Sequence, residues 1–354
     1  MEAFITLDTL YLHMKYPKRD VFDFWNDFVK HLDKRVLRTG YVVHDFVVKT
    51  GACGYALSIW NLDARIFLTD QVDQKCGDGN GMGIWIQLGP KFLIEHGKNL
   101  QGAVKDLLDK AGTHGDYPIS ITRLDMAVDL LGVSMLDQDV NKWSEDWVGR
   151  SKLSALFRNS RTGNLETMYI GSRSSPVFIR VYDKVAQSLG DGDYQYWLDI
   201  WKGFTGDVTR IEWEVKPKDG NFYDDLKDFS LFNGFSIREL MNYLLDWGRL
   251  CDENPDDSNR RRWPDSRFWA DLRAFVVKWG DGVDWPTSRL GKSFHGVSPA
   301  YLKFVSGTLS GAMARLSENE PSMYALFDEL NKRGETLESI NRKAKTKAAI
   351  IKRL

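Results

Sequence analysis

Hydrophobic and polar positions follow two different periods along residues 4–217. Alternation with a period of two predicts strands, because successive side chains point to opposite faces of a sheet. Apolar residues spaced three and four apart predict amphipathic helices. The predicted strands are 4–14, several within 40–72, 84–90, 120–133, a pair within 166–184, and 207–217, and the predicted helices are 18–37 and 98–112. This order, with its meander-like strand pairs, favours an α+β fold with a mostly antiparallel sheet and flanking helices.

The pattern changes after Pro217 and becomes mainly helical. A charged, proline-containing linker is expected at 252–265. The predicted helices are 235–251, 266–280, 298–318 and 322–354. We therefore expect two domains: a larger one over 1–250 and a smaller, mainly helical region over 251–354.

Composition limits the class of protein. The 354 residues exceed one ordinary core, and the 43% hydrophobic content argues against wholesale disorder. The three cysteines have no metal-binding or disulfide spacing. The N-terminal stretch is too polar for a signal peptide, and no apolar run reaches the length of a membrane helix. We expect a soluble, cytoplasmic protein that does not bind a membrane. The net charge of −1 neither suggests nor excludes nucleic acid.

Several common sites are absent from the sequence. The glycine-rich stretch 77–83 fits neither a dinucleotide-binding fingerprint nor a phosphate-binding loop and is expected to be a hairpin loop. The six histidines include no pair with metal-binding spacing, and no GxSxG motif is present.

Charged residues share one face of three predicted strands, with apolar residues on the other face. The shared-face residues are Arg123, Asp125 and Asp129 in TRLDMAVD; Arg180, Tyr182 and Lys184 in FIRVYDK; and Arg210, Glu212, Glu214 and Lys216 in TRIEWEVK. An exposed sheet face with cross-strand ion pairs would show the same pattern. The alternative is a site for phosphoryl chemistry, in which carboxylates bind Mg²⁺ or Mn²⁺, cations offset phosphate charge and a tyrosine attacks.

The segments ITRLDMAVDL, ETMYIGSRSSPVFIRVYDK and TRIEWEVK resemble, in order and approximate spacing, the three signature segments of the replication-initiation-factor family. That family contains rolling-circle initiators of plasmids, relaxases of integrative conjugative elements and initiators of filamentous phages. The segment GIWIQLGPKFLIEHG resembles the family more weakly, and the resemblance covers roughly residues 5–220. It implies a metal-dependent endonuclease that nicks and rejoins origin DNA through a 5′-phosphotyrosine intermediate, with residues 1–250 as the catalytic domain.

The resemblance also implies roles for single residues. Tyr182 corresponds to the nucleophile, whereas Tyr169 in the partner strand is expected to be structural. Arg180 and Lys184 would neutralise the scissile phosphate. The expected ligands of Mg²⁺ or Mn²⁺ are Asp129 and Glu212 first, with Asp125 and Glu214 as further ligands or supports. Asp125 could instead orient Arg123 or Arg210.

An initiator must bind double-stranded origin DNA and also single-stranded DNA. The residues expected to contact DNA are Arg123, Arg210, Arg173, Arg260, Arg261, Arg262, Lys343, Lys345 and Lys347. The last three belong to residues 341–354, which contain six cations and no acid, so that 251–354 is expected to be a DNA-binding region. Host helicase and polymerase are further expected partners. One nucleophile per chain favours a homodimer, although Tyr194 or Tyr196 could supply a second tyrosine within one chain.

Three alternatives stay open from the sequence. The same chemistry could serve a conjugative relaxase. A DNA-binding protein that has lost catalysis would retain the fold, although the retained Tyr182 and four acids argue against it. A tyrosine recombinase or type IB topoisomerase would build its site from arginines and histidine without a metal, which the acid-rich strands oppose.

Overall fold

The computed structural model describes residues 2–15, 20–69, 82–114, 117–135, 138–151, 154–217, 226–232 and 234–281. The chain divides into two compact units, Met1–Pro286 and Thr287–Leu354, and all described residues belong to the first. This unit extends past residue 250, and the assignment of separate functions to 1–250 and 251–354 stays a prediction. The predicted helices 298–318 and 322–354 and most of the predicted loop 77–83 lie outside the described residues.

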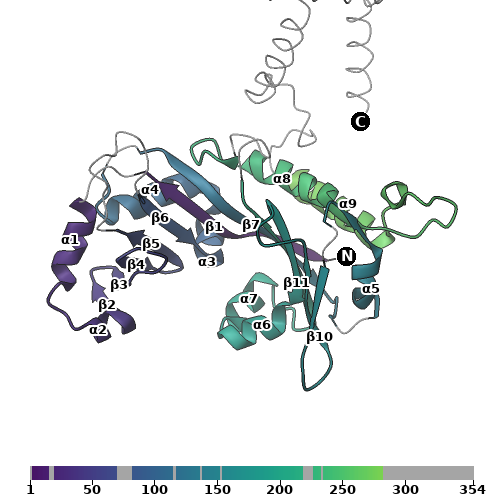
Figure 1. Ribbon diagram of the computed structural model, residues 1–354, viewed down its shortest axis with the longest axis horizontal. Helices are drawn as coiled ribbons and strands as arrows, with labels where there is room; N and C mark the ends of the chain where they lie inside the picture. Colours follow the sequence, from purple (N-terminus) through teal and green to yellow (C-terminus); the bar gives the residue numbers. More distant parts are fainter. Residues whose placement is uncertain are drawn as a thin grey trace, which may run out of the picture. The chain divides into compact units, whose positions relative to one another are not determined.

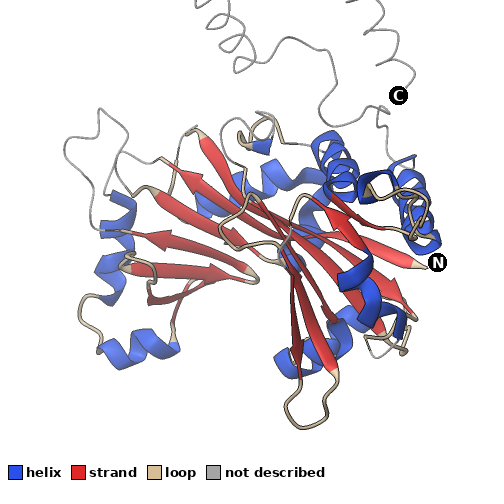
Figure 2. Cartoon of the chain, turned by 45° about the vertical axis from the view of Figure 1, so that its right-hand side comes forward, coloured by secondary structure: helices blue, strands red, loops and turns tan. Residues whose placement is uncertain are grey.

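One large sheet forms the centre of the first unit (Figures 1 and 2). Its eleven strands are ordered β2-β3-β4-β5-β6-β1-β7-β12-β11-β10-β9. These strands are β1 (Ala3–Met14), β2 (Tyr41–Val43), β3 (Phe46–Thr50), β4 (Leu57–Asn61), β5 (Ala64–Leu68), β6 (Ile84–Leu88), β7 (Ile119–Leu131), β9 (Ser154–Arg158), β10 (Leu165–Ile170), β11 (Val177–Asp183) and β12 (Val208–Val215). Every neighbouring pair is antiparallel, which confirms the predicted α+β fold.

Helices flank this sheet. They are α1 (Asp20–Val29), α2 (Lys34–Thr39), α3 (Pro90–His96), α4 (Leu100–Lys110), α5 (Gln138–Asp146), α6 (Lys184–Asp191), α7 (Tyr194–Ile200), α8 (Gly234–Trp247) and α9 (Arg267–Asp281). Short 3₁₀ turns lie at Gly97–Asn99 and Arg260–Arg262, and β8 (Trp147–Gly149) pairs with β13 (Gly248–Leu250) in a separate small sheet. No helix in the described ranges is long and apolar enough to cross a membrane.

Two local signals explain where the structure departs from the predicted elements. The predicted helix 18–37 is split into α1 and α2, because Asp33 is extended and its carboxylate accepts a hydrogen bond from the Arg35 amide, 2.8 Å away. Such a side chain caps a new helix N-terminus. The predicted strand 84–90 ends at Leu88, and Pro90 starts α3, as proline often does at a first helical position.

The two faces of the central strands have different coverings. On the apolar face the buried side chains include Leu124, Met126, Val128 and Trp213. Helices α8 and α9 pack against each other, and α9 approaches β1 (Figure 1). Helices α6 and α7 cover one end of the opposite, charged face, where Trp197 and Trp201 pack with Leu131 and Val208. The rest of that charged face holds the candidate site.

Candidate active site

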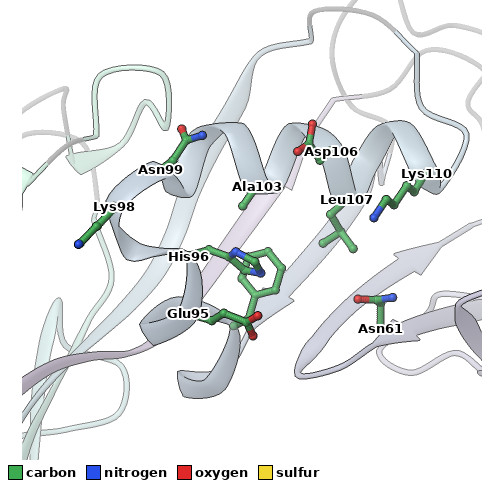
Figure 3. A pocket seen from close by; sticks show the side chains of 10 residues that line it. Asn61, Glu95, His96, Lys98, Asn99, Ala103, Asp106, Leu107 and Lys110 are labelled. Carbon is green, nitrogen blue, oxygen red and sulfur yellow. The ribbon is translucent and has the colours of Figure 1, made fainter.

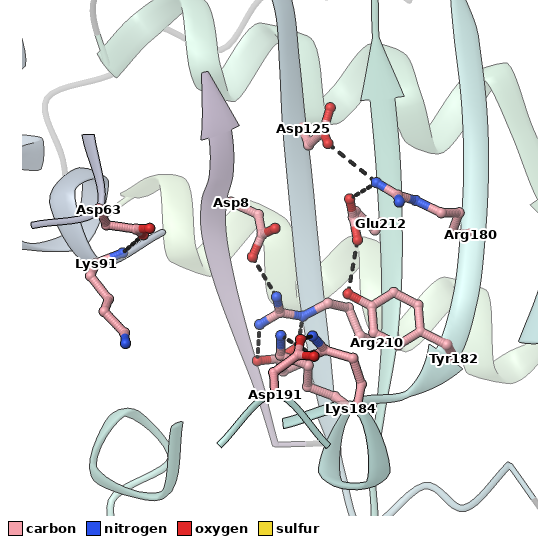
Figure 4. Close-up of polar contacts among 12 residues, drawn as sticks. Asp8, Asp63, Lys91, Asp125, Arg180, Tyr182, Lys184, Asp191, Arg210 and Glu212 are labelled. Carbon is pink, nitrogen blue, oxygen red and sulfur yellow. Dashed lines mark hydrogen bonds and ion pairs between the residues drawn. The ribbon is translucent and has the colours of Figure 1, made fainter. Parts of the chain in front are cut away.

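Strand pairing brings the three charged segments together. Strand β12 lies between β7 and β11, so the predicted acids and cations alternate across three adjacent strands (Figure 4). The cross-strand pairs are Tyr182 with Arg210, Arg180 with Glu212, Arg210 with Asp129, and Glu214 with Asp125. The charged residues that the sequence placed on one face of each strand therefore lie next to one another in the sheet.

This charged face is buried, so the interpretation as a solvent-exposed sheet surface is wrong. The exposed fractions are 0% for Asp125, Asp129 and Arg210, and 3% for Glu212 and Glu214. Buried charges are costly unless they are paired and hydrogen-bonded. The contacts below show which partner satisfies each of them.

The Tyr182 hydroxyl donates a hydrogen bond to Oε2 of Glu212 over 2.8 Å (Figure 4). Burial raises the pKa of Tyr182 well above its usual value of 10, and the negative charge of Glu212 adds to the rise. The phenol is therefore protonated at neutral pH. Glu212 is the group in position to accept its proton.

Arg180 connects three carboxylates. Its Nη2 atom donates to Oε1 of Glu212 and lies 3.3 Å from Oδ2 of Asp125 and 3.9 Å from Oε2 of Glu214. Burial would raise the pKa of Glu212, but the positive charges of Arg180 and Arg210 outweigh it and lower that pKa. Burial raises the pKa of Asp125 to about 8 against the opposing effect of Arg123. The pKa values of Asp125 and Glu212 therefore shift in opposite directions, and Glu212 is the one that ionises more readily.

Arg123 is held by the same acids. Its Nε donates to Oδ1 of Asp125 over 2.8 Å, and its Nη2 lies 3.1 Å from Oε2 of Glu214. One option that the resemblance left open, in which Asp125 orients Arg123, is present in the structure. Oε2 of Glu214 is buried and accepts no hydrogen bond.

Arg210 and Asp129 form a second, deeper group. Nε and Nη2 of Arg210 donate to the two oxygens of Asp129 over 2.5 and 2.7 Å, and the indole of Trp201 donates to Oδ2 over 2.9 Å. Arg210 is fully buried in this structure, and its expected contact with DNA stays a prediction. Both Asp129 oxygens are engaged as well, and the expected role of Asp129 as a metal ligand stays a prediction.

Asp8 is a member of this group that the sequence interpretation missed. Its Oδ1 accepts from Nη1 of Arg210 over 2.5 Å, and Figure 4 shows it projecting from β1 toward that guanidinium. A register shift between Leu7 and Thr9 lies beside it. Strand 4–14 was predicted, but its single acid lies outside the three segments that carry the resemblance. An acid within a predicted strand was the available signal.

Lys184 starts helix α6 rather than extending the strand as predicted. The Asp183 carboxylate caps this helix by accepting from the Ala186 amide over 2.9 Å. Lys184 is nevertheless buried, with Nζ 2.6 Å from Oε1 of Gln187 and 4.2 Å from the ring centre of Trp197. Burial, followed by the positive charge of Arg210, lowers the pKa of Lys184 to about 8.

The other predicted DNA contacts lie apart from this group. Arg173 is exposed in the β10–β11 hairpin, over the rings of Tyr169 and Phe178, which supports a packing role for Tyr169. Residues Arg260, Arg261 and Arg262 form an exposed 3₁₀ turn. Lys343, Lys345 and Lys347 lie outside the described residues.

The acids as arranged do not form a metal cage. In the described part of the chain, no three histidine, cysteine, aspartate or glutamate side chains are grouped to hold a metal ion. The oxygen donors are of the kind that Mg²⁺ and Mn²⁺ prefer, but Arg180 lies among Asp125, Glu212 and Glu214. A metal ion could use these oxygens only if the guanidinium moved.

A separate pocket of about 320 Å³ contains none of the predicted site residues (Figure 3). Its lining residues are Asn61, Phe92, Glu95, His96, Lys98, Asn99, Ala103, Asp106, Leu107 and Lys110. They come mainly from α3 and α4. The candidate chemistry therefore lies on the sheet face rather than in this pocket.

No protein-family model matches the sequence, and no curated protein matches it. Among solved structures, the chain is similar to a rolling circle replication initiator protein from Geobacillus stearothermophilus, with a TM-score of 0.49 and 19% sequence identity. The match covers 78% of this chain and 97% of that one.

Proposed function

We propose that this protein initiates rolling-circle replication by nicking and rejoining origin DNA through a covalent tyrosine link. The observation that carries the proposal is the 2.8 Å hydrogen bond from Tyr182 to Glu212, set among buried cations on adjacent strands. The resemblance of the three strand segments to replication initiation factors supports the same function.

In the proposed step the Tyr182 oxygen attacks a backbone phosphorus atom. Its proton passes to Glu212, a new phosphorus–oxygen bond forms, and the bond to the 3′ oxygen breaks. The products are a 5′-phosphotyrosine and a 3′-hydroxyl, once the leaving oxygen has taken a proton. The free energy of the phosphodiester is kept in the protein–DNA bond, so rejoining needs no nucleotide cofactor.

The surrounding cations have separate proposed tasks. Lys184, next along the chain from the nucleophile strand, offsets the charge that develops on the phosphate. Arg180 keeps Glu212 ionised and therefore able to accept the proton. Arg210, which donates hydrogen bonds to Asp8 and Asp129, holds strands β1, β7 and β12 together beneath the site. The released 3′-hydroxyl then primes a host polymerase, with a host helicase separating the strands.

We further propose that cleavage requires Mg²⁺ or Mn²⁺. The oxygen chemistry of Asp125, Glu212 and Glu214 supports this, whereas their present contacts with Arg180 do not. A bound divalent ion would supply Lewis-acid stabilisation of phosphate charge. Cleavage that persists in excess EDTA would remove the metal from the proposal and leave the tyrosine chemistry standing.

The decisive experiment incubates the full-length protein with supercoiled replicon DNA and Mn²⁺, then digests the products and maps the modified peptide by mass spectrometry. A nucleotide adduct on Tyr182 is the expected result. A protein that binds the origin but forms no adduct is a non-catalytic origin-binding protein. An adduct on another tyrosine would overturn the assignment of the nucleophile.

A further inference from the structure

The charged face of the sheet continues from the candidate site onto strands β1, β6, β5 and β4. Strand register places five side chains in one row across them. In order across the sheet they are Arg123, Tyr11, Gln87, Arg65 and Trp60. Arg123 has the same strand parity as Asp125, so the row lies on the face that carries Tyr182. All five are half-buried and reach solvent.

Two cations of this surface lie over the same aromatic ring. Nζ of Lys49 lies 3.9 Å from the ring centre of Trp60, and Cζ of Arg65 lies 4.2 Å from it. Within the described ranges neither forms an ion pair, in contrast to the cations around Tyr182. Asp63, between β4 and β5, accepts a hydrogen bond from the Lys91 amide at the start of α3. In the described part of the chain, the surface therefore has two cations without an ion-pair partner.

Aromatic rings also lie in the part of this surface between Arg123 and Arg65. Arg123 lies over the Tyr11 ring at 5.0 Å, and Tyr11 meets Trp85 edge-on with ring centres 5.4 Å apart. Trp85 is also half-buried, and it occupies the same face of β6 as Gln87. Cations alternating with half-exposed rings on one face of a sheet suit a polymer that has phosphates and unpaired bases.

We propose that this surface, defined by Lys49, Trp60, Arg65 and Tyr11, binds the single-stranded DNA that adjoins the nick. The inference rests on the proposed function, because it extends the face that holds the scissile phosphate. Lys49 and Arg65 contact phosphates, and the rings of Trp60 and Tyr11 contact bases. A duplex would offer this face phosphates but no free base surfaces, so it would use the cations alone.

The test measures binding of the full-length protein to a fluorescein-labelled oligothymidylate of about 20 nucleotides, longer than the roughly 4–16 that one such surface covers. The double variant Lys49→Ala/Arg65→Ala should flatten the slope of log K against log salt by about 1.4, because each phosphate contact on a single strand contributes about 0.7. Trp60→Leu should weaken binding about fivefold or more at fixed salt.

The matched control is Lys98→Ala/Arg161→Ala, which removes one exposed lysine and one exposed arginine from segments outside the row and outside 251–354. It should leave the salt slope unchanged. Thermal unfolding of each variant verifies that the fold is retained. Equal slopes in the wild type and the Lys49→Ala/Arg65→Ala variant would overturn the proposal. An equal effect of Trp60→Leu on a duplex of the same length would overturn the assignment to a single strand.

This experiment can fail independently of the proposed function. If the wild type forms a Tyr182 adduct but the surface variants bind oligothymidylate normally, the binding surface is wrong and the chemistry stands. If no adduct forms but the surface variants lose single-strand binding, the surface is right and the nicking function is wrong.

Discussion

Tyr182 lies between two groups of charges that are each centred on arginine. One joins Arg180 to Glu212 and Asp125, and the other joins Arg210 to Asp129. Removing one member of such a buried pair leaves an uncompensated charge and costs several kcal/mol. Conservative substitutions at the nucleophile therefore test the chemistry more cleanly than substitutions at its neighbours.

Tyr182→Phe should abolish adduct formation and nicking while origin binding is retained. The change removes the hydroxyl and its hydrogen bond to Glu212 but keeps the ring. Denaturing electrophoresis of protein incubated with labelled origin DNA measures the adduct. Tyr169→Phe is the control, because that ring packs against Phe157 and Phe178 and should remain active. An adduct in Tyr182→Phe but not in Tyr169→Phe would reverse the two roles.

Arg180→Gln should increase the affinity for Mn²⁺ by about tenfold or more. Its guanidinium lies 3.3 Å from Asp125 and 3.9 Å from Glu214, and even two unit charges of like sign about 4 Å apart repel by about 4 kcal/mol near a protein surface. Isothermal titration calorimetry measures the affinity without reference to cleavage. The control is Arg173→Gln, because Arg173 is exposed and contacts none of these acids. This variant should bind Mn²⁺ as the wild type does. Identical affinities for wild type and Arg180→Gln would place any metal ion elsewhere.

Lys184 should make stability depend on pH in the alkaline range. Its pKa falls from 10.5 to about 8 in the folded protein, so between these values the unfolded chain binds more protons. The free energy of unfolding should then rise with pH in this window, by about 2 kcal/mol between about pH 8 and 9.5 for this group alone. Urea unfolding compares wild type with Lys184→Met, which lacks the rise. Parallel pH profiles for the two proteins would contradict the assignment.

At the scale of elements, the α6–α7 segment determines which end of the charged face is closed. Trp201 on the C-terminal side of α7 donates its indole hydrogen to Asp129, and Trp197 lies with its ring centre 4.2 Å from Cζ of Arg210. At the other end, Tyr182 is half-buried among the described residues. The segment thus leaves the nucleophile reachable while it isolates the Arg210 group.

Trp201→Phe should lower the free energy of unfolding by about 1.5–3 kcal/mol, the usual loss for a hydrogen bond to a charged group. Trp25→Phe is a matched control, because Trp25 is equally buried but donates to the neutral Ala111 carbonyl. That control should lose about 0.5–1.5 kcal/mol, the value for a neutral pair. Chemical denaturation measures both. A loss at Trp201 no larger than at Trp25 would show that Asp129 gains nothing from the indole.

The same elements show what the sequence could predict. Alternation with a period of two fixed the faces of 120–133 and 207–217, because strand geometry allows no other placement of successive side chains. It could not tell a buried charged face from an exposed one, since cross-strand partners depend on strand order and register. The burial of Asp129 could not be predicted, because it depends on Trp201 at the end of α7 and the sequence pattern after Lys184 predicted no helix. Asp8 needed a register shift that depends on pairing with β7.

At the scale of the molecule, the arginines near Tyr182 are each held by carboxylates, so affinity for a long polyanion must come from other surfaces. The acids are Asp8, Asp125, Asp129, Glu212 and Glu214, and their cationic neighbours are Arg123, Arg180, Lys184, Arg210 and Lys216. The proposed single-strand surface supplies two further cations, Lys49 and Arg65. Finding one origin among many competing duplex sites requires more than that.

Residues 341–354 are the strongest cationic segment by sequence, with six cations and no acid. If all six contact phosphates of a duplex, each contributes about 0.9 to the salt slope, so deleting 341–354 should flatten that slope by up to about 5. Electrophoretic mobility shift at several salt concentrations measures this on origin duplex. Cleavage of a pre-melted oligonucleotide should change little, because Tyr182 and its acids lie in the unit Met1–Pro286. An unchanged slope would move the duplex-binding assignment to Arg260, Arg261 and Arg262, which are exposed on the described part of the chain.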